Sequence, residues 1–267
     1  MKHSTAYAQN QIKADCADGI GWLTIDNPSR KNAVTAAMWR ALPGAIHWLH
    51  ADCGARVILL CGGGAGDFCA GADISEFTTV RSDRETARTY EESNSRAFAA
   101  IRDAPVPVIA AIRGVCYGGG LGLAAAADLR LAARTAVFAI PAARLGLAYP
   151  ADAVEDLMRG LGPQLARRML FTGGALSASD LLTSGFIDTL TEPETLLSQA
   201  EALARTIANN APRSIHAAKL ALRAVETGDP DRMRDAEVIG AQTFESADYA
   251  EGRQAFAEKR KPTFTGG

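Results

Sequence analysis

The sequence YGGGLGLAAAAD, residues 117–128, places three consecutive glycines before a run of small apolar residues. The small side chains from Leu121 to Ala127 predict a helix that can pack closely against its neighbours. Glycine at the start of a helix leaves backbone N–H groups open, because no side chain covers them. No ionisable side chain lies between Tyr117 and Asp128, so any chemistry here has to come from the backbone.

The glycines can be interpreted in several ways. A phosphate-binding loop requires a Gly-Lys pair, and the chain has none. A dinucleotide-binding fingerprint fits residues 120–125, but it requires an acid about 20 positions later. No acid lies between Asp128 and Asp152, which disfavours that interpretation. The glycines could also serve only the close packing of a helix on a sheet.

A further interpretation is an oxyanion site, in which backbone N–H groups hold a negatively charged oxygen. The dipole at a helix N-terminus favours negative charge there. A second donor has to come from another loop, and the small-residue segment CAGAD, residues 69–73, is a natural source because it also opens a helix. Two such donors can hold the oxygen of an enolate, each contributing about 3–4 kcal/mol at the transition state.

Strands are predicted where apolar residues alternate with polar ones or form short buried runs. They fall at 19–26, 56–64, 104–114, 129–132 and 136–139, with helices at 32–52, 83–103 and 161–173. Pro43-Gly44 predicts a kink or break in the first helix, and residues 1–15 are expected to be frayed. From about 194 to 260 only helix is predicted, with breaks at Pro212 and at 228–230. We therefore expect an α/β core over residues 1–195 and a helical region over 196–267.

The composition excludes several classes of protein. The 267 residues carry 28 basic and 30 acidic side chains, a net charge of -2, with no basic excess that would favour nucleic acid. The sequence contains no run of about 18 apolar residues, so no membrane helix is predicted. Residues 1–13 lack the apolar region of a signal peptide. The 5 cysteines form no C-x-x-C pair. We expect reduced thiols, no bound metal and a cytoplasmic protein.

Several segments together resemble the crotonase (enoyl-CoA hydratase/isomerase) superfamily. They are CAGADISEF (69–77), PVIAAIRGVCYGGGLGLAAAADLRLAA (107–133), FAIPAARLGL (138–147), LARRMLFTGGALSASDLLTSGFID (165–188) and EGRQAFAEKRKPTF (251–264). The resemblance implies a spiral of ββα units, followed by a C-terminal helical region that packs a homotrimer or homohexamer. It also implies an acyl-CoA thioester as ligand, with coenzyme A as part of the substrate and no permanently bound cofactor. Neither nucleic acid nor membrane is implied as a partner.

The resemblance also assigns roles to single residues at matching positions. The amides of Ala72 and Gly119 would hold the thioester oxygen. The segment 70–74, with Ala70, Asp73 and Ile74, would line the CoA arm, and Arg30 and Lys31 would lie near the nucleotide end. Lys259 would reach the CoA phosphates, in a neighbouring subunit. A solvated helix end remains the alternative for Lys259.

Both carboxylates that the hydratases of this superfamily use are missing. The first would lie three residues beyond the oxyanion glycine, where this chain has Gly122, and the second would follow Pro141, where it has Ala142. Isomerases and dehalogenases of the superfamily often carry an acid at the position of Pro150, which is also absent. General acid–base catalysis is typically worth about 100- to 10,000-fold per group. The usual hydration mechanism is therefore disfavoured.

Two residues are candidates for a different chemistry. The stretch FAIPAARLGLAY resembles the methylmalonyl-CoA decarboxylases of the superfamily, in which a tyrosine matching Tyr149 contacts the substrate carboxylate. In those enzymes a histidine stands where this chain has Ala72. Asp152 is the second candidate. We expect a lyase or isomerase acting on a CoA thioester, of decarboxylase or isomerase type. The alternatives are a catalytically degenerate acyl-CoA-binding protein and a weak hydratase that uses Asp152 or Glu76.

Overall fold

A seven-stranded sheet forms the centre of the computed structural model, which describes residues 3–64 and 66–267. The strand order is β1-β2-β3-β4-β5-β7-β10. The strands are β1 (His3–Tyr7), β2 (Ile12–Ala17), β3 (Ile20–Ile25), β4 (Val57–Gly62), β5 (Val108–Ile112), β7 (Leu129–Ala133) and β10 (Thr189–Thr191). The first three are antiparallel, and every pairing from β3 onward is parallel.

The predicted frayed N-terminus is wrong for the described residues from 3 onward. Strands β1 and β2 pair in register from His3 opposite Cys16 to Tyr7 opposite Ile12. The reason lies in β2, where Ile12, Ala14 and Cys16 alternate with more exposed residues and are buried. This period of two puts one apolar face of the strand on the core.

A second, small sheet branches from the first and leads to the glycine run. It has the order β6-β8-β9, with β6 (Val115–Tyr117), β8 (Val137–Ala139) and β9 (Leu176–Ser177). The chain passes from β5 to β6 through Gly114, whose φ of 56° lies in the left-handed region. Helix α4 (Gly119–Ala126) then starts two residues after β6 ends.

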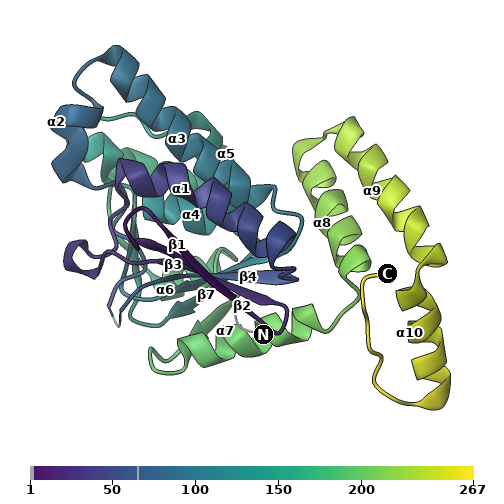
Figure 1. The fold of residues 1–267 in the computed structure, drawn as a ribbon. Helices are drawn as coiled ribbons and strands as arrows, with labels where there is room; N and C mark the ends of the chain where they lie inside the picture. The colour runs from purple at the N-terminus through teal and green to yellow at the C-terminus, as the bar shows by residue number, and fades with distance from the viewer. Residues whose placement is uncertain (1–2, 65) are drawn as a thin grey trace.

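Helices cover both faces of the large sheet (Figure 1). On one face lie α1 (Ala36–His47), α3 (Arg84–Arg102), α4 and α5 (Ala151–Thr172), together with the short α2 (Phe77–Val80). On the other lies α7 (Leu196–Ala208), which packs Leu196, Ala200 and Ala204 against the sheet with the four-residue spacing of one helix face. Helix α6 (Ala178–Thr183) follows β9, and Ser177 caps its start as an N-cap.

Of the kink or break predicted at Pro43-Gly44, the break does not occur: α1 runs through both residues to His47 and continues as a π-turn over Trp48–Asp52. Proline inside a helix costs about 3 kcal/mol. Helix α1 buries Met38, Trp39 and Leu42 completely. Burying each such side chain contributes roughly 1.5–3 kcal/mol, so the packed face outweighs the proline.

The C-terminal region is helical, with breaks before Pro212 and at 228–230 where the sequence predicts them, and a further break over residues 243–246. Helix α8 (Pro212–Thr227) begins at Pro212, α9 (Pro230–Gln242) begins after Gly228 and Asp229, and α10 (Ala247–Glu258) follows. These three helices stand to one side of the sheet (Figure 1). They and the 3-10 turn Thr243–Glu245 expose large apolar side chains, namely Leu222, Val225, Val238, Phe244 and Phe256. None of the helices in the described part of the chain is long and apolar enough to cross a membrane.

Candidate active site

Two loops that are far apart in the sequence meet at the start of α4. Cys69 pairs with Cys116: its N–H donates to the carbonyl of Val115 at 3.0 Å, and its carbonyl accepts from the N–H of Tyr117 at 2.9 Å. This pairing holds the segment after Cys69 beside the residues that lead into α4. A β-carbon built on Gly119 would consequently lie 3.7 Å from the nitrogen of Ala72.

The amides of Ala72 and Gly119 are both left without an intramolecular acceptor among the described residues. Val34 donates to the carbonyl of Gly71 at 2.7 Å and accepts from the N–H of Asp73 at 2.9 Å. In a parallel pairing of this kind the N–H of the residue in between points away from the partner strand. Gly119 is the first residue of α4, and the first N–H groups of a helix have no partner inside it.

At two positions of this junction, Gly71 and Gly119, no residue with a β-carbon fits. Gly71 has a φ of 97°, and a β-carbon on it would lie 2.8 Å from the carbonyl oxygen of Tyr117. A β-carbon on Gly119 would lie 2.8 Å from the ring of Trp39. Both distances are shorter than real contacts of a β-carbon. The glycines therefore let the two loops approach each other and leave the N–H groups uncovered.

A cavity of ≈ 120 Å³ opens beside these amides, and Ala72 and Gly119 both line it. Its apolar walls come from α1, α2, α3 and the segment after β8, and include Trp39, Phe77, Phe98, Leu145 and Leu147. Trp39 and Phe98 meet edge to face with their ring centres 5.5 Å apart. The indole N–H of Trp39 donates to the hydroxyl of Tyr90 at 3.1 Å, which fixes the position of this wall.

Of the two positions at which the family resemblance led us to expect missing carboxylates, Ala142 lines the cavity and Gly122 lies behind Phe98 and Tyr149, which line it. A β-carbon on Gly122 would lie 2.8 Å from the ring of Phe98 and 2.9 Å from the hydroxyl oxygen of Tyr149. The space that a longer side chain would enter at residue 122 is therefore filled. Ala142 lies in the 3-10 turn Pro141–Leu145 and lines the cavity with a methyl group.

Tyr149 lines the cavity next to the two loops that meet at the start of α4. Its hydroxyl donates to the carbonyl of Gly118, the residue before α4, at 2.9 Å. Burial raises the pKa of this hydroxyl well above its usual value. Tyr149 therefore stays protonated at neutral pH and can act there as a neutral hydrogen-bond donor.

The other candidate acids are not brought to the cavity. Asp152, on α5, accepts a hydrogen bond from the hydroxyl of Ser95 at 3.1 Å and does not line the cavity. Glu76 accepts from the N–H of Ala36 at 2.7 Å, at the start of α1. Asp73 accepts from the N–H and hydroxyl of Ser75. Each of these carboxylates has a structural hydrogen bond that accounts for its position.

The expected CoA-binding residues fall into two groups. Arg30 and Lys31 are exposed, and the carbonyl of Lys31 accepts from the N–H of Ala70 at 2.9 Å, which joins Lys31 to the loop that contains Ala72. Ala70 and Ile74 line the cavity, and Ile74 is 65% exposed at its edge. Arg30 and Lys31 do not themselves line the cavity.

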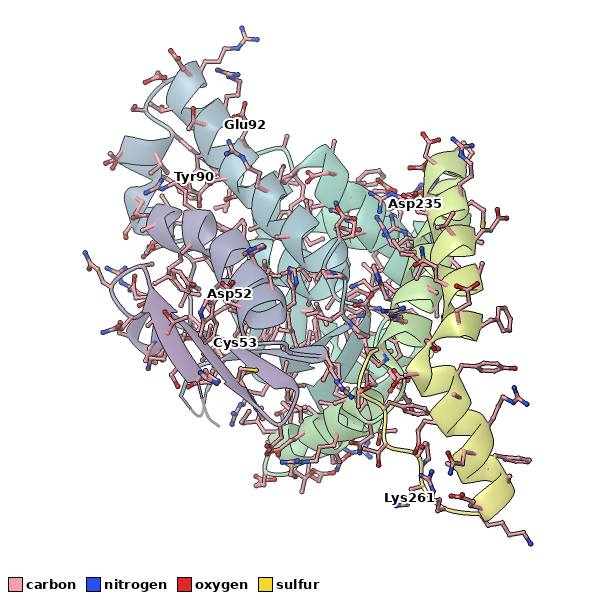
Figure 2. All side chains as sticks on the ribbon, turned by 45° about the vertical axis from the view of Figure 1, so that its right-hand side comes forward. Asp52, Cys53, Tyr90, Glu92, Asp235 and Lys261 are labelled. Atoms are coloured by element: carbon pink, nitrogen blue, oxygen red, sulfur yellow. The ribbon has the colours of Figure 1, made fainter. Side chains whose placement is uncertain are left out.

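Lys259 is not part of this group within one chain. It ends α10 with a φ of 54°. In Figure 2, Lys261, two residues after Lys259, lies on the opposite side of the molecule from Tyr90. Tyr90 bonds to Trp39 in the cavity wall. A role for Lys259 at this cavity would therefore need a second subunit.

Three further polar residues line the cavity that were not predicted from the sequence, namely Arg81, Glu91 and Asn94. Glu91 and Asn94 lie on α3 at the spacing of one helix face, with Phe98 four residues further on. The sequence signal that could have identified them is this polar pair on the apolar face that buries Phe98. Arg81 follows α2, and no spacing rule connects it to α3.

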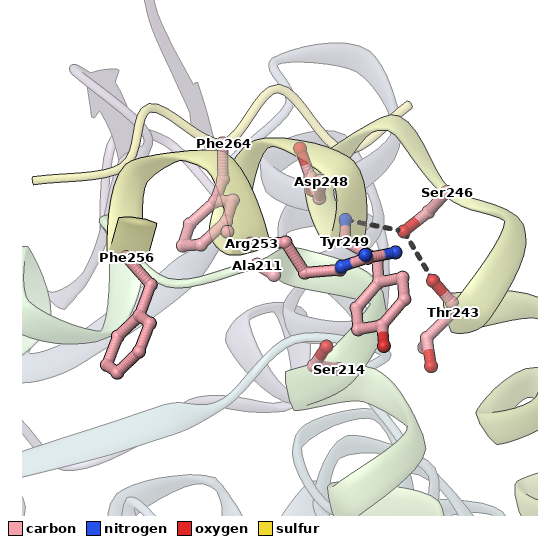
Figure 3. A pocket seen from close by; sticks show the side chains of 10 residues that line it. Ala211, Ser214, Thr243, Ser246, Asp248, Tyr249, Arg253, Phe256 and Phe264 are labelled. Carbon is pink, nitrogen blue, oxygen red and sulfur yellow. Dashed lines mark hydrogen bonds between the residues drawn. The ribbon is translucent and has the colours of Figure 1, made fainter. Parts of the chain in front are cut away.

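A larger hollow of ≈ 560 Å³ lies among the C-terminal helices (Figure 3). It contains none of the predicted site residues. Polar groups at its edge serve the start of α10, where Ser246 donates to the carbonyl of Thr243 at 2.6 Å and accepts from the N–H of Tyr249 at 3.1 Å. No group of three or more metal-ligating side chains occurs in the described part of the chain. We therefore place the candidate site at the glycine junction, where the free N–H groups are.

Comparisons with known proteins agree on one family. The family model described as enoyl-CoA hydratase/isomerase matches residues 15–267. Crotonyl-CoA hydratase from Syntrophomonas wolfei is 31% identical over 96% of this chain and 98% of its own. The human enoyl-CoA hydratase domain-containing protein 2, mitochondrial, is 34% identical over 93% of this chain and 86% of its own. The crystal structure of an enoyl-CoA hydratase/isomerase family protein from Hyphomonas neptunium superposes with a TM-score of 0.91 at 38% identity, covering 96% of this chain and 97% of that one.

Proposed function

Because this chain belongs to the enoyl-CoA hydratase/isomerase (crotonase) family and has its fold, we propose that it binds an acyl-CoA thioester with the thioester oxygen between the amides of Ala72 and Gly119. The observation that carries this proposal is the pair of unpartnered N–H groups at one cavity. Two such donors stabilise the negative charge that develops on a thioester oxygen when an enolate forms.

We infer that the reaction does not use a pair of carboxylates. Residues 122 and 142 are glycine and alanine, and the space beside Gly122 is occupied by Phe98 and Tyr149. Decarboxylation of a malonyl-type thioester needs no general base. The bond from the α-carbon to the carboxylate breaks, its electron pair forms the enolate, carbon dioxide leaves, and a proton from solvent then adds to the α-carbon.

Tyr149 suits this reaction as a positioning group for the substrate carboxylate. A neutral hydroxyl donates a hydrogen bond to a carboxylate without adding charge to the cavity. In the structure this proton points to the carbonyl of Gly118, so it would have to swing to the substrate. An isomerase of the same family type, which moves a double bond through the same enolate, uses the same two amides.

Hydration is the second candidate function, because several relatives are named hydratases. It requires a group that removes a proton from water. Among the described residues that line the cavity, Glu91 carries the only carboxylate, and it is paired with Arg81 at 2.5 Å. Asp152 and Glu76 are held elsewhere by Ser95 and Ala36. These contacts support the decarboxylase type over hydration.

The oligomeric state forms part of the same proposal. Exposed apolar side chains gather on the C-terminal helices, and exposed patches of this kind mark interfaces between proteins. Phe256, on α10, is 88% exposed and is three residues before Lys259. We propose a homotrimer or homohexamer in which these helices pack together and Lys259 reaches the CoA phosphates bound to a neighbouring subunit.

A panel of CoA esters tests the proposed function. Malonyl-CoA and methylmalonyl-CoA are assayed for release of carbon dioxide, and crotonyl-CoA is assayed for loss of its conjugated double bond. Turnover of a malonyl-type ester with little or no hydration is the expected result. Rapid hydration of crotonyl-CoA with no decarboxylation would overturn the preference for decarboxylation. Tight binding without turnover of any ester would instead indicate an acyl-CoA-binding protein without activity.

A further inference from the structure

The cavity has a polar end that the oxyanion interpretation does not use. Three side chains form it: Arg81 after α2, and Glu91 and Asn94 on α3. The Arg81 guanidinium pairs with one oxygen of Glu91 at 2.5 Å, and the Asn94 amide nitrogen lies 3.4 Å from the other. The guanidinium also lies over the ring of Phe77 at 4.0 Å, so it is held on two sides.

Three buried atoms of this polar end have no hydrogen-bond partner among the described residues. They are Nε and Nη1 of Arg81 and Oδ1 of Asn94. The Arg81 side chain is 16% exposed and Asn94 is 5% exposed. Buried polar atoms nearly always have hydrogen-bond partners in folded proteins. Unsatisfied ones at the wall of a cavity therefore indicate that a bound molecule supplies the missing partners. The unsatisfied set comprises two donors and one acceptor.

The charge of the polar end is already balanced. Glu91 neutralises Arg81 through the 2.5 Å contact. A second carboxylate placed beside Arg81 would face the like charge of Glu91 with no further cation to balance it, which is unfavourable. It would also face Oδ1 of Asn94 with a lone pair, because an ionised carboxylate has no proton to donate. A methyl group would leave all three atoms unsatisfied.

We propose that the acyl group bound in this cavity carries an uncharged polar group, of which a hydroxyl is the simplest, where it meets Arg81 and Asn94. A hydroxyl oxygen accepts from the Arg81 N–H groups, and its proton is donated to Oδ1 of Asn94. The preference concerns only the chain end that meets Arg81 and Asn94: a hydroxyl is favoured there over a methyl group or a second carboxylate, whatever group the α-carbon carries beside Tyr149. This inference rests on the proposed function, because it assigns the acyl end of the same site.

Binding measurements with unreactive esters test this inference separately from catalysis. Three series of saturated acyl-CoA esters are compared by calorimetry at several chain lengths, ending in a methyl group, a hydroxyl group or a carboxylate. At the chain length that reaches Arg81, the hydroxyl ester is expected to bind at least about 10-fold more tightly than both matched esters, since a site built to bond a hydroxyl rejects analogues without one.

Two variants distinguish the loss of a hydrogen-bond acceptor at the polar end from a general effect on the fold. Asn94→Leu removes the acceptor at nearly constant volume, and the preference for the hydroxyl ester is expected to fall by at least about 5-fold. Glu92→Gln is the matched control on the same helix, because Glu92 is exposed at the surface (Figure 2) and pairs with Arg88 and Arg96. It is expected to keep the preference.

The outcomes distinguish this inference from the proposed function. Equal binding of the three series at every chain length would overturn the inference and leave acyl-CoA binding intact. Tighter binding of the carboxylated series would overturn it as well. If no CoA ester binds at all, both the inference and the proposed function fail. Should Asn94→Leu not fold, the three series on the unaltered protein still decide the matter.

Discussion

The hydroxyl oxygen of Tyr149 lies 2.9 Å from the point where a β-carbon on Gly122 would stand. The same hydroxyl donates to the carbonyl of Gly118 at 2.9 Å. The tyrosine therefore occupies the space that opens at residue 122 and braces the residue before α4. A longer side chain at residue 122 could not be accommodated with Tyr149 and Phe98 in these positions.

Gly122→Ala tests this packing through stability. The new methyl group would lie 2.8 Å from the Phe98 ring, and overpacking of this kind costs about 1–3 kcal/mol. We expect the free energy of unfolding in urea to fall by that amount. Gly44→Ala is the matched control, since nothing lies within 4 Å of a β-carbon at that position in α1. It is expected to stabilise the protein by about 0.5–1 kcal/mol. Equal stability of the two variants would contradict the packing described for Gly122.

Tyr149→Phe tests the role of the hydroxyl. A hydrogen bond to a charged group contributes about 1.5–3 kcal/mol, so kcat/KM for the malonyl-type substrate is expected to fall roughly 10- to 150-fold. The dissociation constant of butyryl-CoA, which has no carboxylate, is expected to stay within about twofold. Unchanged turnover of the malonyl-type ester would show that the hydroxyl only braces Gly118.

Alkaline pH is expected to destabilise the protein. Burial raises the pKa of the Cys69 thiol to about 12, from 9.0. Between these values the unfolded chain has lost the thiol proton while the folded chain keeps it, so the free energy of unfolding falls as pH rises. The slope is about 1.4 kcal/mol per pH unit for each such thiol, and the buried Cys116 adds to it.

Urea unfolding at pH 8, 9, 10 and 11 measures this slope. Stability is expected to be level up to about pH 9, the ordinary pKa of a thiol, and then to fall. Cys69→Ala is expected to make the decline shallower. A free energy of unfolding that stays constant from pH 9 to 11 would contradict the burial of these thiols.

Ala72→Pro removes one proposed oxyanion donor without deleting a side chain. Because the Ala72 N–H has no acceptor within the described residues, the substitution breaks no hydrogen bond of the fold, and the free energy of unfolding of the variant is measured alongside its activity. Loss of one such donor typically lowers kcat about 100- to 1,000-fold. Ala72→Ser keeps the N–H and is the control, with activity expected within about threefold of the original protein. A proline variant that folds and retains full turnover would rule out the Ala72 amide as a donor.

Part of this site could be predicted from the sequence, because N–H groups stay uncovered where glycines precede a helix. The glycines near residues 71 and 119 are required by contacts to Tyr117 and Trp39, and no other residue type fits. The polar end could not be predicted, because Arg81 and Glu91 meet only through the turn between α2 and α3. Local rules do not specify how such a turn brings two side chains together.

The fold errors have the same origin. The break expected at Pro43 follows from local backbone chemistry, whereas the helix continues because its face is buried against the sheet and α3. The pairing of β1 with β2 likewise depends on what the β2 side chains pack against. Where a segment's conformation is set by its own backbone, as at Pro212 and Gly228, the sequence was sufficient.

The central claim is that the N–H groups of Ala72 and Gly119 converge on one thioester oxygen. A crystal structure of the protein with an unreactive acyl-CoA analogue measures this directly. We predict that the thioester oxygen lies about 2.7–3.1 Å from both nitrogens, with the acyl chain directed towards Arg81 and Asn94. A bound analogue whose thioester oxygen lies beyond hydrogen-bond distance of both amides would contradict the account.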